Sequence, residues 1–360
     1  METEAVFQIT RIPLKRTMVL RQAGFGLAEI MVGMAIGLVT TLVIVQVMGL
    51  FEGQKRSTSG SSDAQSSGGL AMYTLQRQLQ QAGYGMPINS TQSSSMQCDP
   101  ASTVNNDTGA TNVSVSPIEI TDGGASGGSD TVTVRYGDSA MGGVPIKVSS
   151  VTGNIIGITN NFGCNVNDIA LVSSGSSCRT SKVTAVDAGH TQITVTTGTN
   201  MAAGAMLSCM GNWTTTAYSV SADGNLLANG QPVAAGIVNI QAQYGVSSAP
   251  GNNTVTTWVD ATGTWAPASI SLTDRNRIKA IRVAIVARNT QFEKQNVTIA
   301  CSSQTLAAPT GLCTWEGSTT NPAPKIDLTA DTNWKRYRYR VFETIIPLRN
   351  VIWSKGVLPP

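Results

Sequence analysis

The residue types that support catalysis are sparse in this sequence. His190 is its only histidine, so a Ser-His-Asp triad and a histidine-ligated metal site each lack a necessary group. No P-loop or glycine-rich nucleotide fingerprint follows a strand-like segment. Asp122, Asp130 and Asp223 stand in turn-like stretches, but they do not form an EF-hand loop, so we interpret them as turn residues rather than calcium ligands. We therefore predict a protein that is not an enzyme and has no cofactor and no metal. The enzymatic alternative is a membrane-anchored hydrolase with paired carboxylates, but no motif in the sequence places two acids as such a pair.

One acid, Glu29, stands inside an apolar stretch that runs from Phe25 to Phe51. An acid at bilayer depth costs about 2.5–3.5 kcal/mol at the centre and less near an edge. The small residues Ala23 and Gly24 precede the stretch, whereas a secretory signal peptide is cut after its apolar core. Cleavage after Gly24 would place the new α-amine of Phe25 on the same helix face as Glu29, where the helix N-terminus also favours an anion. The carboxylate would then have a cationic partner, in its own chain or in a neighbouring subunit; the alternative is an uncleaved signal anchor.

The cysteines indicate an oxidising compartment. The six are Cys98, Cys164, Cys178, Cys209, Cys301 and Cys313. None forms a C-x-x-C pair, so we expect disulfides rather than a zinc or redox site. Cys301 with Cys313 is the simplest local pair, and the pairing of the other four stays open.

Three arginines near the C-terminus alternate with aromatic residues. Arg336, Arg338 and Arg340 flank Tyr337 and Tyr339, and such a stripe could bind nucleic acid through phosphate charge and base stacking. The other interpretation is a strand whose arginines face acids or solvent while the tyrosines pack. We favour the strand and do not expect nucleic-acid binding.

The apolar stretch itself predicts a membrane-spanning or membrane-assembled helix. Its residues would rise about 40 Å as a helix, enough for a hydrocarbon core of about 30 Å. Lys and Arg residues are in excess on its N-terminal side, which predicts a cytoplasmic N-terminus and an exported remainder. Because only 12% of residues are charged while 36 are glycine, we expect a β-rich secreted body with many turns.

Beyond the apolar stretch, the chain predicts a weakened helix and then strands. Residues 57–69 are rich in serine and glycine, so we expect the helix to be loosened there. It should resume with Leu70, Tyr73 or Thr74, and Leu79 on one face and end at Gly83 and Gly85. The predicted strands are Thr131–Tyr136, Asp168–Ser173, a hairpin of Lys182–Val186 with Gln192–Thr196, Ala217–Ser221, Val238–Val246 with one wet face, Ile278–Val286 as a central strand covered by the helix, and a period-two segment within Trp334–Trp353.

The segment from Gly24 to Ile30 resembles the class III signal of type IV pilins and pseudopilins, usually G-F-[ST]-L-[IV]-E. Gly24, Phe25, Leu27 and Glu29 match, while Gly26 and Ala28 depart from the pattern. The resemblance implies cleavage between Gly24 and Phe25 by a prepilin peptidase, N-methylation of Phe25, and a role for Glu29 in subunit docking.

The C-terminal part is similar to PilW-like minor pilins of type IV pili. Their closing R-Y-R…E-T…P-L-R-N motif matches Arg338–Asn350, and the Gln241–Gly245 strand, the strand end at Arg288 and the helix end Ala82–Gly85 add to it. The resemblance covers roughly residues 20–86 and 237–353.

This resemblance implies an α+β, pilin-like fold: a long hydrophobic N-terminal helix on an antiparallel β-rich head with a large β-rich insertion. We expect a leader at 1–24, the pilin helix at 25–86 with its membrane or filament part to about residue 51, and the head at 87–360.

The function implied is that of a minor pilin in pilus assembly initiation or at the tip. Its implied partners are other minor and major pilins, the prepilin peptidase, the inner-membrane assembly platform and a large tip adhesin. It would sit in the bacterial inner membrane by one span and then move to the pilus at the cell surface, with roles in adhesion and twitching motility. A minor pseudopilin of type II secretion and a DNA-uptake or surface-binding receptor are the alternatives.

Overall fold

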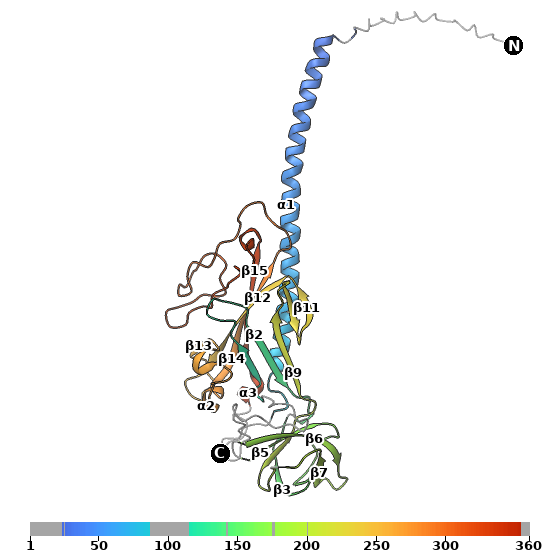
Figure 1. Ribbon diagram of the computed structural model, residues 1–360, viewed down its shortest axis with the longest axis vertical. Helices are drawn as coiled ribbons and strands as arrows, with labels where there is room; N and C mark the ends of the chain where they lie inside the picture. The colour runs from blue at the N-terminus through green and yellow to red at the C-terminus, as the bar shows by residue number, and fades with distance from the viewer. Residues whose placement is uncertain are drawn as a thin grey trace, which may run out of the picture. The chain divides into compact units, whose positions relative to one another are not determined.

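The structure is a computed structural model that describes Gly24 and residues 26–86, 115–141, 143–174, 177–199 and 201–353. It divides into two compact units, Met1–Arg56 and Ser57–Pro360. The predicted α+β class is confirmed: one long N-terminal helix is followed by antiparallel strands (Figure 1).

The long helix α1, Leu27–Gln81, continues through the serine- and glycine-rich stretch. The expectation that residues 57–69 are loosened is therefore wrong. Gly60 is covered by the side chain of Asn289, and Gly68 by the ring of Phe342, so closely that a Cβ at either glycine would overlap them. Since helix stability in proteins comes mainly from tertiary packing, this close approach outweighs the poor helix propensity of glycine.

The second half of α1 buries a seam with steps of three and four residues. Ala64, Gly68, Ala71, Leu75 and Leu79 lie on it, as helical periodicity requires. The predicted face is only partly right: Leu79 is buried, but Leu70 and Tyr73 are exposed. The predicted end is correct, because Gly83 and Gly85 adopt φ of 77° and 74° directly after the helix, a conformation that glycine accepts without steric cost.

Two antiparallel sheets pack with this seam into one hydrophobic core. The first has the order β13-β12-β14-β15. Its strands are β12 (Ile237–Val246), β13 (Thr257–Val259), β14 (Ile278–Arg288) and β15 (Tyr339–Pro347). As predicted, β14 is central, pairing with β12 on one side and β15 on the other.

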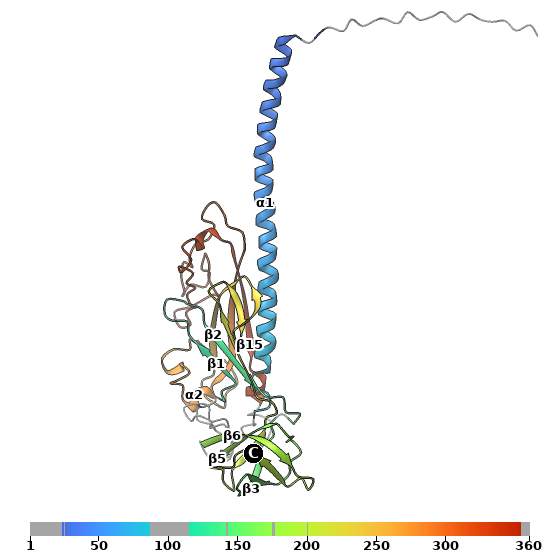
Figure 2. The ribbon, with the colours of Figure 1, turned by 45° about the vertical axis from the view of Figure 1, so that its right-hand side comes forward.

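The second sheet has the order β1-β2-β9-β10-β11. Its strands are β1 (Ile118–Thr121), β2 (Thr131–Tyr136), β9 (Thr214–Val220), β10 (Asn225–Ala228) and β11 (Gln231–Ala235). Strand β2 has the predicted bounds and β9 overlaps its predicted segment. Figure 1 labels β12, β13, β14 and β15 of the first sheet and β2, β9 and β11 of the second, and Figure 2 labels β1 beside β2.

A closed six-stranded barrel is inserted between β2 and β9, in the order β3-β4-β7-β6-β5-β8. Its strands are β3 (Ile146–Thr152), β4 (Ile155–Ile158), β5 (Ile169–Ser174), β6 (Ser177–Val186), β7 (Gln192–Val195) and β8 (Met206–Cys209). The predicted hairpin is present as β6 paired with β7. The barrel has its own apolar core, which includes Val148, Ile156, Val183 and Leu207, and it is the β-rich insertion that the resemblance implies.

Short helical segments complete the described chain. They are η1 (Gly263–Trp265), α2 (Leu272–Arg275), η2 (Trp334–Arg336) and α3 (Arg349–Trp353). Just after β15, the Asn350 side chain donates hydrogen bonds from Nδ2 to the carbonyls of Gln80, Gln81 and Ala82 at 3.2–3.4 Å. It thereby satisfies carbonyls that a helix C-terminus leaves without partners.

Candidate functional site

Glu29 lies in the first turn of α1. Its Oε2 accepts a hydrogen bond from the backbone N–H of Gly26 at 3.0 Å, so the carboxylate stands at the positive end of the helix dipole. Phe25, whose α-amine is expected to pair with Glu29 after cleavage, lies outside the described residues. The structure therefore shows a helix-start acid held by backbone, and cleavage at Gly24–Phe25 and methylation stay predictions.

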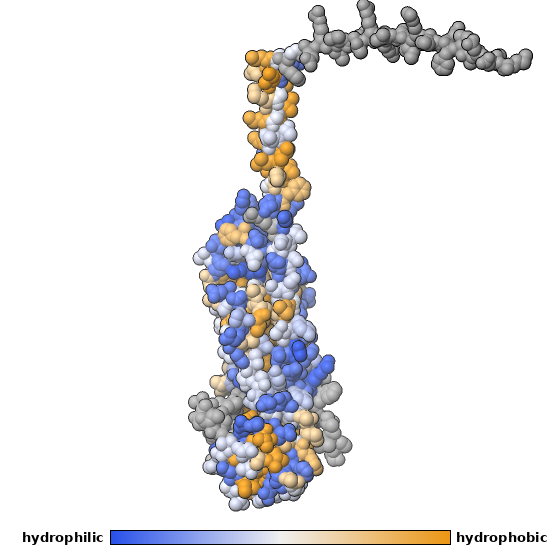
Figure 3. All heavy atoms as spheres, turned by 90° about the vertical axis from the view of Figure 1, so that its right-hand side faces the viewer, coloured by the Kyte–Doolittle hydropathy of each residue, from blue (hydrophilic) through white to orange (hydrophobic). Residues whose placement is uncertain are grey.

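The first part of α1 presents an apolar surface on all sides. The side chains of Leu27, Met34, Leu38 and Phe51 are each more than three-fifths exposed, and Figure 3 shows this part of the helix covered by hydrophobic residues. The hydroxyls of Thr40 and Thr41 donate to helix carbonyls at 2.7–3.0 Å, which satisfies them without water.

By length and composition, this helix could cross a membrane. Its apolar surface needs a lipid or protein environment, because soluble proteins rarely expose contiguous patches of this kind.

The polar residues of β12 are buried, contrary to the predicted wet face. Asn239, Gln241 and Gln243 are each at most 3% exposed. The amides of Asn239 and Gln241 donate to the carbonyls of Gly127 and Gly128 at 3.2 and 2.7 Å. A loop more than a hundred residues away in the chain therefore accepts the hydrogen bonds of Asn239 and Gln241, whereas Gln243 bonds to Asp260.

Asp130 anchors that loop. Its carboxylate accepts hydrogen bonds from the N–H groups of Gly123 at 2.8 Å and Ala242 at 2.7 Å. Burial raises the pKa of Asp130 to about 7, although these two donors act to lower it. Asp122 only caps a local turn through Gly124 N–H, and no group of acids, cysteines and histidines in the described residues could hold a metal ion.

Arg282 of β14 is sandwiched between two tryptophans. Its guanidinium carbon lies 4.9 Å from the ring centroid of Trp258 and 4.2 Å from that of Trp315. Its Nε and Nη2 both donate to Oε1 of Gln243, the former at 2.8 Å, and Gln243 in turn donates to Asp260 at 2.7 Å. Burial lowers the pKa of Arg282 to about 10, and Asp260 and Glu343 oppose that shift.

Sequence reasoning did not find this Arg282 cluster, and its one signal is Gln243, a polar residue within an alternating strand segment. Its partners come from segments far apart in the chain, and the Trp258 ring fits because Gly245 has no side chain to block it. The cluster joins the strands of this sheet to the loop that contains Trp315, although the buried Nε1 of Trp315 has no hydrogen-bond partner among the described residues.

The arginine stripe does not form one continuous strand. Arg336 belongs to η2 and Arg340 to β15. Arg336 donates to the carbonyls of Glu293 and Lys294 at 2.9 and 3.1 Å, and Arg338 pairs with the Glu293 carboxylate at 2.9 Å. Two of the three arginines are thus engaged by the chain itself, as the strand interpretation expects.

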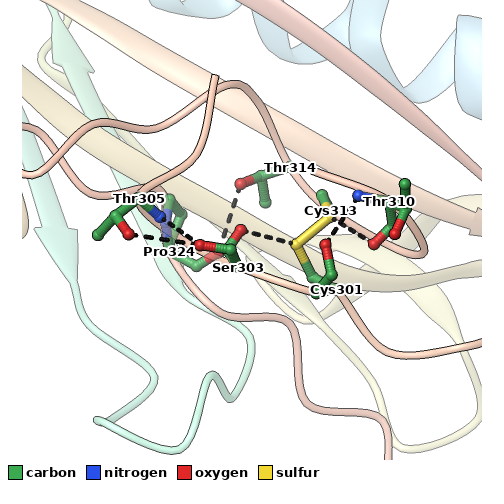
Figure 4. The surroundings of a disulfide bond; sticks show 8 residues. Cys301, Ser303, Thr305, Thr310, Cys313, Thr314 and Pro324 are labelled. Atoms are coloured by element: carbon green, nitrogen blue, oxygen red, sulfur yellow. Dashed lines mark hydrogen bonds between the residues drawn. A yellow bond between two sulfur atoms is a disulfide. The ribbon is translucent and has the colours of Figure 1, made fainter. Parts of the chain in front are cut away.

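Two disulfides lie wholly within the described residues. Cys301 is bonded to Cys313, the local pair suggested by the sequence, and Cys164 to Cys209 at the barrel. Figure 4 shows the first of these among Ser303, Thr310 and Thr314. Cys178 is disulfide-bonded as well, and Cys98 lies outside the described residues.

His190 lies in the turn between β6 and β7, as predicted. It has a φ of 58°, its Nδ1 is 2.7 Å from Asn161 Oδ1, and its ring stacks near Phe162 at 4.7 Å. No serine or acid is placed to form a triad with it among these contacts.

Comparison with known proteins gives one family. Residues 199–350 match the family described as PilW, Type IV Pilus-assembly protein W. A solved structure of a type IV-like pilin from Thermus thermophilus aligns with 79% of this chain and 95% of its own at 12% identity, with a TM-score of 0.33, which is too low to establish a shared fold. No curated protein matches the chain in sequence. The resemblance to PilW-like proteins is thereby confirmed for residues 199–350, the part that contains the three sheet strands of the Arg282 cluster and the closing strand β15.

Proposed function

We propose that this chain is a minor pilin, made as a membrane-anchored precursor and inserted into a type IV pilus. The observation that carries the proposal is the family match over residues 199–350 together with an N-terminal helix whose apolar side chains are exposed all round. A structural subunit needs such a helix to leave the membrane and pack among like helices, whereas an enzyme needs a reactive site.

In this account the prepilin peptidase cuts between Gly24 and Phe25 and Phe25 is methylated. Glu29, at the start of α1, then pairs with the α-amine of an adjacent subunit, because an acid in an apolar bundle is stable only with a cationic partner. The head takes part in assembly initiation or in the tip complex, with other pilins, the assembly platform and a tip adhesin as neighbours. The N-terminus stays cytoplasmic and the head is periplasmic before assembly.

The test is to follow the subunit into filaments in its native host. Glu29→Ala should leave the protein in the membrane and remove it from sheared pili. The matched control is Asp63→Ala, on the same helix at an exposed position, which should enter filaments normally. Equal recovery of both variants in pili would contradict the docking role of Glu29.

A gene deletion in the native host distinguishes a type IV pilus subunit from a type II secretion pseudopilin. Deletion of the gene should reduce surface pili and leave type II secretion intact; the opposite outcome would assign the chain to a pseudopilus. Unaltered DNA uptake by a variant with Arg336, Arg338 and Arg340 reversed in charge would exclude the receptor role.

A further inference from the structure

A polar cavity lies between α1 and the adjoining ends of β14 and β15. It is lined by Ser61 of α1, Asn289 after β14, Thr298, Arg338 just before β15 and Arg340 within β15. The backbone N–H of Asn289 donates to the Arg338 carbonyl at 2.9 Å, which holds these two walls together. We call this the arginine cavity.

Asn289 contributes a buried donor to the arginine cavity. The residue is 1% exposed, and its Oδ1 accepts the N–H of Gln291 at 2.7 Å. Its Nδ2 has no hydrogen-bond partner among the described residues. The side chain lies directly on Gly60, where any Cβ would overlap it, so its position is fixed. A buried donor without an acceptor is unfavourable, and a ligand that accepts its hydrogen bond would be stabilised.

The charges at the arginine cavity favour an anion. Arg338 uses its Nε for Glu293 at 2.9 Å, which leaves its terminal amino groups for another acceptor. Arg340 is exposed; its backbone belongs to the pairing of β14 with β15, and its side chain makes no hydrogen bond or ion pair with another described residue. The lining includes no acid. The Thr298 hydroxyl is occupied, since it donates to the Tyr337 carbonyl at 2.6 Å.

We propose that the arginine cavity binds an oxyanion, a phosphate or carboxylate group. Arginine forks match the planar or tetrahedral arrangement of such oxygens and form charge-assisted hydrogen bonds with them. The Asn289 amide would donate to one oxygen, Arg340 and the free end of Arg338 to the others, and the Ser61 hydroxyl completes the wall. Such a group could come from free phosphate, from an anionic lipid headgroup or from an acidic side chain of a neighbouring subunit.

The test is calorimetric titration of the full chain in detergent with inorganic phosphate and, separately, with acetate, at constant ionic strength. Saturable binding of at least one anion at one site per chain is expected. Arg340→Gln should weaken it by about tenfold, because a hydrogen bond to a charged group is lost. Arg349→Gln removes the same charge from an exposed position outside the cavity and should change the affinity less than about twofold. Asn289→Asp, which places a negative charge at the buried donor, should abolish binding.

Absence of saturable binding by both anions, or an equal loss in Arg340→Gln and Arg349→Gln, would overturn the proposal. If Asn289→Asp fails to fold, the Arg340→Gln and Arg349→Gln pair still decides it. The source of the bound oxyanion is identified by repeating the phosphate titration in nanodiscs of phosphatidylcholine, with or without the anionic lipid phosphatidylglycerol. Loss of phosphate binding only with phosphatidylglycerol assigns the site to a lipid headgroup, and unchanged binding assigns it to a soluble or protein-borne anion.

Discussion

At the scale of single residues, Asp130 joins two parts of the head that are distant in sequence. It receives N–H groups from Gly123 and from Ala242 and is 3% exposed. The residues around Asp130 predict an exposed turn. The strand that buries Asp130 is more than a hundred residues away in the chain. Local composition cannot reveal such a contact, and this is why the turn interpretation missed it.

The raised pKa of Asp130, from 3.8 to about 7, makes stability depend on pH. Between these values the folded chain holds a proton that the unfolded chain has lost, so the free energy of unfolding falls as pH rises, by about 1.4 kcal/mol per pH unit. Urea unfolding between pH 4 and pH 7 should show at least this slope in the wild type and a shallower slope in Asp130→Asn, where the raised pKa values of Asp168, Asp260 and Glu343 still act in the same direction. The control Asp223→Asn, in an exposed turn, should keep the slope, and a flat wild-type profile would contradict the assignment.

Arg282 is the second residue whose environment decides stability. Arg282→Met would leave Gln243 Oε1 without its donors and take the cation from between Trp258 and Trp315. We expect a loss of about 2–4 kcal/mol, because the buried Gln243 Oε1 loses its charged donors and two cation–π contacts are removed. Arg338→Met, whose side chain is 48% exposed in its pair with Glu293, should cost less than about 1 kcal/mol. Similar losses in the two variants, measured by urea unfolding, would show that the Arg282 cluster has no special role.

At the scale of elements, helix α1 shows where propensity rules fail. Glycine lowers the helix propensity of an isolated segment by about 1 kcal/mol per residue, and on that rule residues 57–69 should be loose. The structure instead uses Gly60 and Gly68 to bring Asn289 and Phe342 against the helix backbone. Alternation and apolar runs predict strands more reliably, because β2, β12 and β14 all lie where these patterns place them. The burial of the polar face of β12 could not be predicted from the sequence, since the loop that covers it is remote in the chain.

Two adjacent glycines test this packing. Gly68→Ala would press a methyl group into the Phe342 ring, whereas a Cβ at Gly69 meets open space. We expect Gly68→Ala to destabilise the head by about 1–3 kcal/mol and Gly69→Ala to stabilise it by up to about 1 kcal/mol. Thermal unfolding of both variants provides the measurement. Stabilisation by both would mean that the helix does not pack on the head at Gly68.

At the scale of the whole molecule, the chain combines an apolar helix start with a head that includes an inserted barrel. The sequence predicts the helix, the C-terminal strands and the family resemblance, because these depend on local pattern and motifs. It does not predict that six strands close into a barrel, because closure requires β3 to pair with β8 across the whole insertion. The insertion lies largely outside the family match at residues 199–350.

The central claim is that the chain enters the pilin pathway at its N-terminus. The measurement that tests it most directly is the intact mass of the protein extracted from membranes of its native host, with and without the prepilin peptidase. We predict loss of residues 1–24 and one added methyl group on Phe25 in the wild-type host, and a full-length chain in the peptidase mutant. An unprocessed N-terminus in both strains would contradict the account and leave a signal-anchored, β-rich protein outside the pilus.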